Sequence, residues 1–253
     1  MQESLRDQIV LVTGASSGIG RAIALACARE GADLVITYRR ERAKAEAVAD
    51  VIRSAGRRVC VLPLDLADPV SIARLASAAR EAFGRMDAWI NNAGADILTG
   101  PGASLSLHDK LDQLLTVDLK GTILASWVAA DLMGAQESGG VIINMSWDHV
   151  LTGMEGKNPE MFAAAKGGVL SFSKSLARSV APRVRVNVLA PGWVDTAFAG
   201  GLDAGRRQAV ADTTPLRRWG TPEDVAGAAV YLASPAAAFL TGQTILINGG
   251  VVM

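Results

Sequence analysis

The stretch TGASSGIG, residues 13–20, decides the fold of this chain. It lies between an apolar run suited to a buried strand, residues 9–12, and an amphipathic helical pattern that starts at residue 21. A strand that turns through glycines into a helix leaves the first backbone N–H groups of the helix without acceptors, and such groups bind phosphate. In this context the spacing Gly-x-x-x-Gly-x-Gly predicts a nucleotide-binding turn rather than a plain strand-to-helix connection.

Composition narrows the classes of partner. Lys plus Arg and Asp plus Glu both number 25, so net charge favours neither a nucleic acid nor a membrane surface as a partner. No apolar run approaches the roughly 18 residues that span a bilayer, and the polar N-terminus shows no signal-peptide pattern. Cys27 and Cys60 lack metal-ligand spacing, which predicts reduced, buried core thiols. We therefore expect a cytoplasmic protein without a metal.

Strand and helix patterns alternate along the whole chain. This alternation predicts one α/β domain of Rossmann type, residues 1–253: a doubly wound parallel sheet of about seven strands with helices on both faces. The predicted strands cover residues 9–12, 33–37, 59–64, 88–91, 141–145, 184–189 and 244–247. After the helix that starts at residue 21, the predicted helices cover about residues 41–55, 70–83, 110–133, 159–180 and 222–233.

Residues that directly follow the strands are candidates for the cofactor site, because ligands of such sheets bind beyond the carboxyl ends of the strands. Arg39 and Arg40 follow the second strand, where NAD-binding folds often carry a carboxylate. Two guanidiniums can hold a 2′-phosphate, which favours NADP(H) over NAD(H); the alternative is a pair of solvated residues at the start of a helix. Asp65 follows the third strand and is a candidate acceptor for adenine or, alternatively, a helix cap.

Taken together, the motifs resemble the short-chain dehydrogenase/reductase (SDR) family of the classical type. They are TGASSGIG, Asp65, the NNAG of residues 91–94, Asn144, Lys166, the Pro-Gly of residues 191–192 with Thr196, and the NGG of residues 248–250. Residues 162–178 look most like those of the 3-oxoacyl-ACP reductases and glucose dehydrogenases of that family.

The resemblance implies positions for the coenzyme and a quaternary structure. Members of the family are commonly tetramers joined by two long helices and the C-terminal strand, so we expect a homotetramer, or a mixed one with an SDR homologue. With the two arginines added, the predicted cofactor-binding residues are Gly14, Ser16, Ser17, Gly18, Ile19, Gly20, Arg39, Arg40, Asp65, Leu66, Asn91, Ala93, Gly94, Lys166, Pro191, Gly192, Val194 and Thr196.

The chain departs from the family where the family does its chemistry. SDR enzymes use an Asn, a Ser, and a Tyr four positions before a Lys, with the Tyr as proton donor. Here Lys166 is kept, but Phe162 stands at the Tyr position, Trp147 at the Ser position and Asp118 at the Asn position. Neither of the chain's two tyrosines falls near that place.

One explanation is an altered reductase. Hydride delivery depends on coenzyme geometry, whereas general-acid help contributes about 10²- to 10⁴-fold. The candidate catalytic residues are then Lys166, Asp118, Asp148 and His149, with His149 either an acid or a hydrogen-bonded loop residue. Peroxisomal 2,4-dienoyl-CoA reductases, an SDR branch, similarly lack the Tyr, keep the Lys and carry an Asp at the position of Asp118. A second Asp of that branch is Asn248 here.

The other explanation is a non-catalytic NADP(H)-binding protein that serves as a scaffold or as a partner subunit. Phe162 keeps the volume of the tyrosine ring without its hydroxyl, which suits a retired site. For the reductase, the expected substrate is a small molecule or an acyl thioester with a carbonyl, an imine or a conjugated C=C. Residues 196–215, with glycines near their start and several arginines near their end, predict a lid over that substrate.

Overall fold

The computed structural model describes residues 4–253, and a parallel sheet of seven strands forms its centre. The strand order is β3-β2-β1-β4-β5-β6-β7. This order reverses direction between β1 and β4, which opens a crevice at the carboxyl ends of these two strands. The strands are β1 (Ile9–Val12), β2 (Asp33–Tyr38), β3 (Val59–Pro63), β4 (Ala88–Asn91), β5 (Gly140–Met145), β6 (Val184–Pro191) and β7 (Thr244–Ile247).

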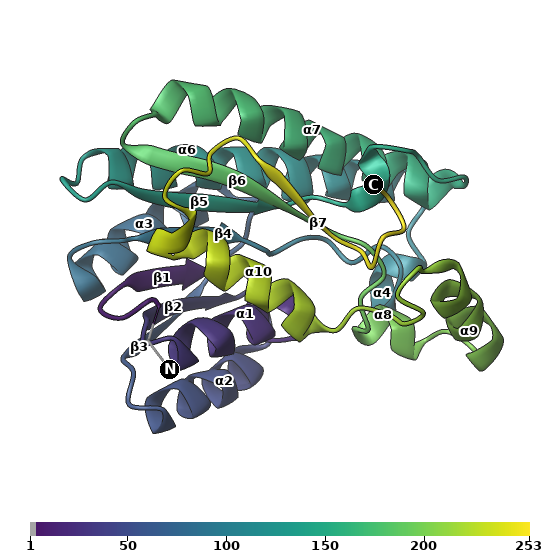
Figure 1. The fold of residues 1–253 in the computed structure, drawn as a ribbon, viewed down its shortest axis with the longest axis horizontal. Helices are drawn as coiled ribbons and strands as arrows, with labels where there is room; N and C mark the ends of the chain where they lie inside the picture. Colours follow the sequence, from purple (N-terminus) through teal and green to yellow (C-terminus); the bar gives the residue numbers. More distant parts are fainter. Residues whose placement is uncertain (1–3) are drawn as a thin grey trace.

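Helices cover both faces of the sheet, as predicted (Figure 1). One face carries α1, α2 and α10, and the other carries α3, α6 and α7. Both faces are apolar because a parallel sheet is buried on both sides, and all four residues of β1 are buried. The helices are α1 (Gly18–Arg29), α2 (Arg42–Ser54), α3 (Pro69–Phe83), α4 (Gly100–Ala103), α5 (Leu107–Gln113), α6 (Thr122–Gly134), α7 (Lys157–Val180), α8 (Ala197–Gly200), α9 (Ala204–Thr213) and α10 (Pro222–Ala233).

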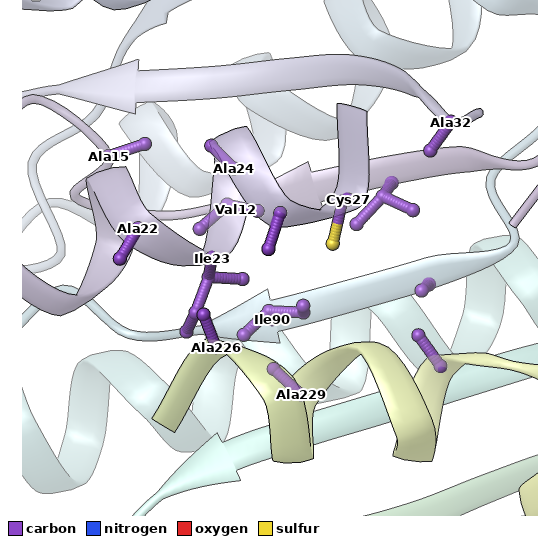
Figure 2. Packing of buried hydrophobic residues seen from close by; sticks show 14 of the residues in the cluster. Val12, Ala15, Ala22, Ile23, Ala24, Cys27, Ala32, Ile90, Ala226 and Ala229 are labelled. Atoms are coloured by element: carbon purple, nitrogen blue, oxygen red, sulfur yellow. The ribbon is translucent and has the colours of Figure 1, made fainter. Parts of the chain in front are cut away.

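Close packing between α1 and α10 fixes the position of the glycine turn. Figure 2 shows Ile23 of α1 pointing at Ala226 of α10, with Ala22 and Ala229 nearby. All four side chains are buried. Small residues let two helices approach closely, so α1 packs against both the sheet and its neighbour α10. Its first turn therefore stands at a fixed place beyond the end of β1.

The cap of α3 decides between the two interpretations of Asp65. The side chain of Asp68 accepts a hydrogen bond from the backbone N–H of Val70, and Pro69 occupies the first turn. Asp68 is thus the N-cap, whereas Asp65 accepts from the backbone N–H of Ala67 at 3.0 Å. Asp65 is not the helix cap.

The long helix predicted over residues 110–133 is only partly correct. The helical run begins earlier, with Ser106 as the N-cap of α5, and a π-helical segment, η1 (Leu114–Gly121), separates α5 from α6. Apolar spacing alone does not reveal this change, because the wider turn shifts side chains without interrupting the helical pattern. Asp118 lies within η1, and π-helical turns are frequent at functional sites.

The two thiols differ from each other. Cys27 is fully buried in α1, as predicted, but Cys60 on β3 is only half-buried because β3 is an edge strand of the sheet. Both are free thiols. The predicted lid region contains the short helices α8 and α9, which lie with α4 beyond the carboxyl ends of the strands (Figure 1). Among residues 4–253, we find no helix long and apolar enough to cross a bilayer.

Candidate functional site

A cavity of about 460 Å³ opens at the carboxyl ends of β1, β2 and β4. It combines the glycine turn with segments far apart in the chain. The predicted cofactor-binding residues that line it are Gly14, Ser16, Ser17, Ile19, Gly20, Arg39, Arg40, Asp65, Leu66, Ala93, Gly94 and Thr196. Its lining also includes residues that the sequence did not single out as binding residues: Thr37, Tyr38, Glu41, Leu64, Asn92 and Val117.

The glycine turn is tied to the neighbouring strand. Gly14 has a φ of +67°, a conformation that side-chain-bearing residues rarely adopt. Its backbone N–H donates to Thr37 Oγ1 at 3.1 Å, and the N–H of Ala15 donates to the Thr37 carbonyl at 3.0 Å. A side chain at Gly14 would also approach Ala93 within 3.0 Å. The turn therefore needs glycine and has one fixed shape.

The start of α1 fits an anionic group. Ser17 is the N-cap of α1 but makes no side-chain capping bond, so the N–H groups of the first turn have no acceptor from the cap. A Cβ on Gly20 would lie 2.4 Å from both the Gly14 carbonyl oxygen and Asn92 Nδ2, so only glycine permits this close approach. Free N–H groups at a helix N-terminus form the cradle that dinucleotide phosphates require.

Positive charge lies at the far end of the same cavity. Arg39 and Arg40 both line it, and Arg39 Nε is 3.6 Å from Asp65 Oδ2. The side chains of Arg39 and Asp65 are 44% and 43% exposed, so this ion pair is weak and open to a ligand. The structure thus brings both arginines to the lining of one cavity with the glycine turn.

Asn91 lies apart from the other predicted cofactor residues. Its side chain is buried, accepts from Trp89 Nε1 and donates to Asn144 Oδ1, each at 2.8 Å. Asn144 in turn donates to Ser173 Oγ at 2.9 Å, which connects β4, β5 and α7. The Asn91 side chain ties strands together, and the cavity lining contains Asn92 instead.

Lys166 and Asp118 form a buried ion pair. Lys166 Nζ lies 2.9 Å from Asp118 Oδ1, and their side chains are 7% and 1% exposed. Asp118 Oδ2 also accepts from the backbone N–H of Ala95 at 2.8 Å. The pair adjoins the cavity, because a side chain at Gly94 would meet Asp118 Oδ1 at 2.8 Å. The π-helical segment thus places the carboxylate beside the lysine of α7.

His149 and Asp148 form a second pair in η2 (Asp148–Val150), a short 3₁₀ helix after β5. His149 Nδ1 and its backbone N–H lie 2.7 and 2.8 Å from Asp148 Oδ1. Asp148 is fully buried, and its Oδ2 accepts from Asn248 Nδ2 at 3.2 Å. A carboxylate acceptor places the proton on Nδ1, which leaves Nε2 for other contacts.

An aromatic wall stands beside both pairs, formed by Trp147, His149, Phe162, Trp193 and Trp219. Trp147 stacks on His149 with ring centroids 4.9 Å apart and meets Phe162 edge-on at 5.4 Å. Trp193 is 6.4 Å from His149 and 5.6 Å from Trp219. The Phe162 ring lies 5.6 Å from Lys166 Nζ, so the ammonium faces a ring without a hydroxyl.

Of the remaining predicted residues, Gly18 begins α1, and the others lie on the side of β6. Pro191 ends that strand, and a side chain at Gly192 would meet Asp148 Oδ2 at 2.9 Å. Val194 is buried and bridges to Gly220. The contact between Asn248 and Asp148 joins residues 100 positions apart, and no spacing in the sequence could have revealed it.

Comparison with known proteins agrees with this geometry. The family model described as enoyl-(acyl carrier protein) reductase matches residues 14–252. An uncharacterized oxidoreductase of Mycobacterium tuberculosis is 40% identical over 98% of this chain and 93% of its own. A 3-oxoacyl-[acyl-carrier-protein] reductase of Synechocystis is 38% identical over 99% of both chains.

A solved structure of similar fold contains a coenzyme. It is a 7α-hydroxysteroid dehydrogenase complexed with NADH and 7-oxo glycochenodeoxycholic acid, 28% identical, with a TM-score of 0.89 over 99% of this chain and 96% of that one. Together, the family model, the two relatives and this fold cover nearly the whole chain. The chain therefore belongs to the short-chain dehydrogenase/reductase family of oxidoreductases.

Proposed function

We propose that this protein is an NADP(H)-dependent reductase of a C=O, C=N or conjugated C=C bond that takes its proton from a group other than tyrosine. The observation that carries the proposal is the cavity with its glycine turn, which adjoins the buried ion pair of Lys166 and Asp118. The glycine turn and the start of α1, whose close approach requires glycine at positions 14 and 20, would bind the coenzyme phosphates.

The preference for NADP(H) rests on Arg39 and Arg40. Planar guanidiniums bind a phosphate through paired, charge-assisted hydrogen bonds, and a 2′-phosphate distinguishes NADP(H) from NAD(H). Asp65 is paired with Arg39 in the cavity lining and would be released to bind adenosine once a phosphate binds the arginine. The solved dehydrogenase holds NADH, so a similar fold accommodates NAD(H), and the two arginines are the feature of this chain that favours NADP(H).

When bound, the reduced nicotinamide supplies a hydride. This chain's own residues would then position the substrate and move the proton. Lys166 and Asp118 could hold one proton between them, and His149 could exchange another through Nε2 because Asp148 fixes its Nδ1. Acid help of this kind contributes about 10²- to 10⁴-fold, so an imperfect donor slows a reaction without abolishing it.

The relatives act on different substrates, and the lid would set the choice. Their names point to a 3-oxoacyl carbonyl, an enoyl C=C and an oxo-steroid. Residues 196–215, which contain α8 and α9, stand beyond the strand ends where a substrate would enter. We assign this segment the role of a lid that closes over the substrate.

The contacts of Lys166 favour a second candidate function. Its ammonium is engaged by Asp118 and faces Phe162, so the lysine that activates the tyrosine in other members has no hydroxyl to act on. A protein that binds NADP(H) without turnover, as a scaffold or as a subunit of a mixed tetramer, would keep the cradle and lose the acid.

One assay separates the two functions. Purified protein is mixed with NADPH and a panel of ketones, cyclic imines and enoyl thioesters, and the loss of nicotinamide absorbance is followed. The reductase gives turnover that falls about 10²-fold or more in Asp118→Asn or His149→Ala. Asp50→Asn, at an exposed position of α2, serves as the control and keeps full activity. Tight NADPH binding without turnover on any member of the panel would indicate the non-catalytic binder.

A further inference from the structure

The buried pair of Lys166 and Asp118 holds its proton too firmly to be a good donor. Lys166 Nζ lies 2.9 Å from Asp118 Oδ1 and 3.4 Å from the Met145 carbonyl oxygen. Asp118 is engaged at both oxygens, because Oδ2 accepts from the backbone N–H of Ala95. A proton given by this lysine would leave a buried carboxylate without its cation, which is costly. The proton is therefore expected to come from the other pair.

The dyad of His149 and Asp148 has the features of a donor. His149 Nδ1 lies 2.7 Å from Asp148 Oδ1, so the two form an ion pair when the ring is protonated. No group that the structure describes forms a hydrogen bond with Nε2, and this atom is not completely buried. An imidazole exchanges protons with water near neutral pH. The dyad can therefore give the Nε2 proton and take another from solvent.

A third side chain, that of Asn248, holds the carboxylate of the dyad. Asp148 is fully buried, and its Oδ1 accepts from both the ring and the backbone N–H of His149. Its Oδ2 accepts from Asn248 Nδ2 at 3.2 Å, the one donor to that oxygen among the residues that the structure describes. Without this amide, a buried carboxylate oxygen would be unsatisfied, and the carboxylate could turn away from the ring.

The C-terminal segment that follows β7 fixes the direction of the Asn248 amide. Its Oδ1 accepts from the backbone N–H of Gly250 at 3.0 Å, and its Nδ2 also donates to the Val252 carbonyl oxygen at 2.9 Å. These two bonds determine which end of the amide is the donor. A Cβ at Gly192 would lie 2.8 Å from Asn248 Cβ and 2.9 Å from Asp148 Oδ2, so glycine leaves room for the contact.

We infer that His149 is the proton donor of the reaction and that Asn248 is its positioning residue, acting through Asp148. This inference rests on the proposed reductase function. As hydride from NADPH adds to the substrate carbon, His149 gives its Nε2 proton to the atom that receives the π electrons. A C–H bond and an O–H, N–H or second C–H bond form, the π bond and the Nε2–H bond break, and two electrons pass from NADPH to the substrate. The neutral ring keeps its proton on Nδ1 and regains one on Nε2 from solvent.

Nitrogen NMR of the histidines tests this orientation without a substrate. The chain has two histidines, so His108→Gln leaves His149 as the single imidazole. In ¹⁵N-labelled protein at alkaline pH, where the ring is neutral, we expect a proton on Nδ1 and none on Nε2. Adding Asn248→Ala should produce a second population with the proton on Nε2. A parent protein protonated on Nε2, or an unchanged spectrum after Asn248→Ala, would overturn the inference.

Asn187→Ala is the matched control for the loss of a structural amide. Asn187 is fully buried on β6, donates to the Leu240 carbonyl at 2.8 Å and accepts from the N–H of Gln243 at 3.1 Å. It forms no hydrogen bond with the dyad. Asn187→Ala should therefore lower stability and leave the position of the imidazole proton unchanged.

A second variant covers the case in which Asn248→Ala fails to fold. In Asn248→Ser, the hydroxyl can still accept from the N–H of Gly250, because serine makes the same kind of turn as asparagine. Its side chain is too short to replace the amide at Asp148. The spectrum of Asn248→Ser should therefore show the same second population, and its absence would count against the inference equally.

A double-mutant cycle tests whether Asn248 acts through the ring of His149. With NADPH and the best compound of the panel, Asn248→Ala should lower kcat about ten-fold. NADPH affinity by calorimetry should not change, since Asn248 does not line the coenzyme cavity. In a His149→Ala background, the same substitution should change kcat by less than about two-fold. Equal losses in both backgrounds would show a merely structural role and defeat the inference.

The outcomes separate the two levels of the account. Tight NADPH binding without turnover of any compound defeats the proposed function and with it the donor role, while the nitrogen spectrum still decides the positioning. Turnover that survives His149→Ala within about two-fold keeps the proposed function and defeats the inference. Turnover lost in His149→Ala, together with the second imidazole population in Asn248→Ala, supports both.

Discussion

At the scale of single residues, Phe162 is the main difference between this active site and that of other SDR enzymes. Its ring lies 5.6 Å from Lys166 Nζ, and the lysine is held by Asp118. Phe162→Tyr restores a hydroxyl but leaves that ion pair in place. We therefore expect only a modest gain in ketone reduction from Phe162→Tyr, and a gain of about 10²-fold or more when Asp118→Asn is added. The measurement is kcat/KM with NADPH, and an unchanged rate in a double variant that still binds NADPH would contradict it.

The thiols give a second prediction at this scale. Burial raises the pKa of Cys27 to about 12, with nearby Glu30 as a smaller cause. Burial also raises the pKa of Cys60, but this thiol is only half-buried. Because the thiolate is the reactive form, Cys60 should react slowly with an aromatic disulfide reagent in the native protein, and Cys27 only after unfolding. Cys60→Ser should abolish the native reaction, and a native reaction that persists in this variant would contradict the account.

At the scale of elements, the start of α10 is stabilised by a capping box. Asp224 is paired with Arg218 and accepts hydrogen bonds from the backbone and side chain of Thr221. These interactions hold the pKa of Asp224 well below its usual range, and the bond to Arg218 is the largest cause. Asp224→Ala should lower the free energy of unfolding by about 1 kcal/mol at pH 7. Because the pKa of Asp224 is lower in the folded state than in the unfolded state, its carboxylate stabilises the fold at pH values above the unfolded-state pKa, which is about 4. This stabilisation is lost as the pH falls from the unfolded-state pKa through the folded-state pKa.

Urea unfolding at pH 7 and pH 3 measures this effect. The difference in the free energy of unfolding between wild type and Asp224→Ala should be larger at pH 7 than at pH 3. Asp212→Asn, at an exposed position of α9, is the control and should match wild type at both. A difference that grows on acidification would contradict the assignment.

Most helices and strands could be predicted from the sequence, but two features of the site could not. Apolar runs located all seven strands, because a parallel sheet is buried on both faces and cannot be built from another pattern. The helical pattern located both ends of α3 within one residue, and the glycine turn located the start of α1 within three. The π-helical segment around Asp118 was not predictable, since it depends on how α5 and α6 pack on α7. The Asp148–Asn248 contact was also hidden, because it forms only when β5 and β7 end at the same edge of the sheet.

At the scale of the whole molecule, α6 and α7 lie side by side on one face of the sheet (Figure 1). Trp127 is 51% exposed and meets Phe172 edge-on at 6.2 Å, beside a cavity of about 550 Å³ between the two helices. As the family resemblance implies for a tetramer, we expect this face to bind a second copy. Trp127→Glu should give smaller assemblies by light scattering, whereas Asp50→Asn should not. An unchanged mass in Trp127→Glu would place the interface elsewhere.

The central claim concerns the whole front half of the sheet: the glycine turn, Arg39 and Arg40 together bind a nicotinamide coenzyme although the tyrosine acid is absent. Isothermal calorimetry with NADPH and NADH tests it most directly. The account predicts binding of NADPH, weaker binding of NADH, and loss of that preference in the Arg39→Ala/Arg40→Ala double variant. Absence of measurable binding for both coenzymes would contradict it.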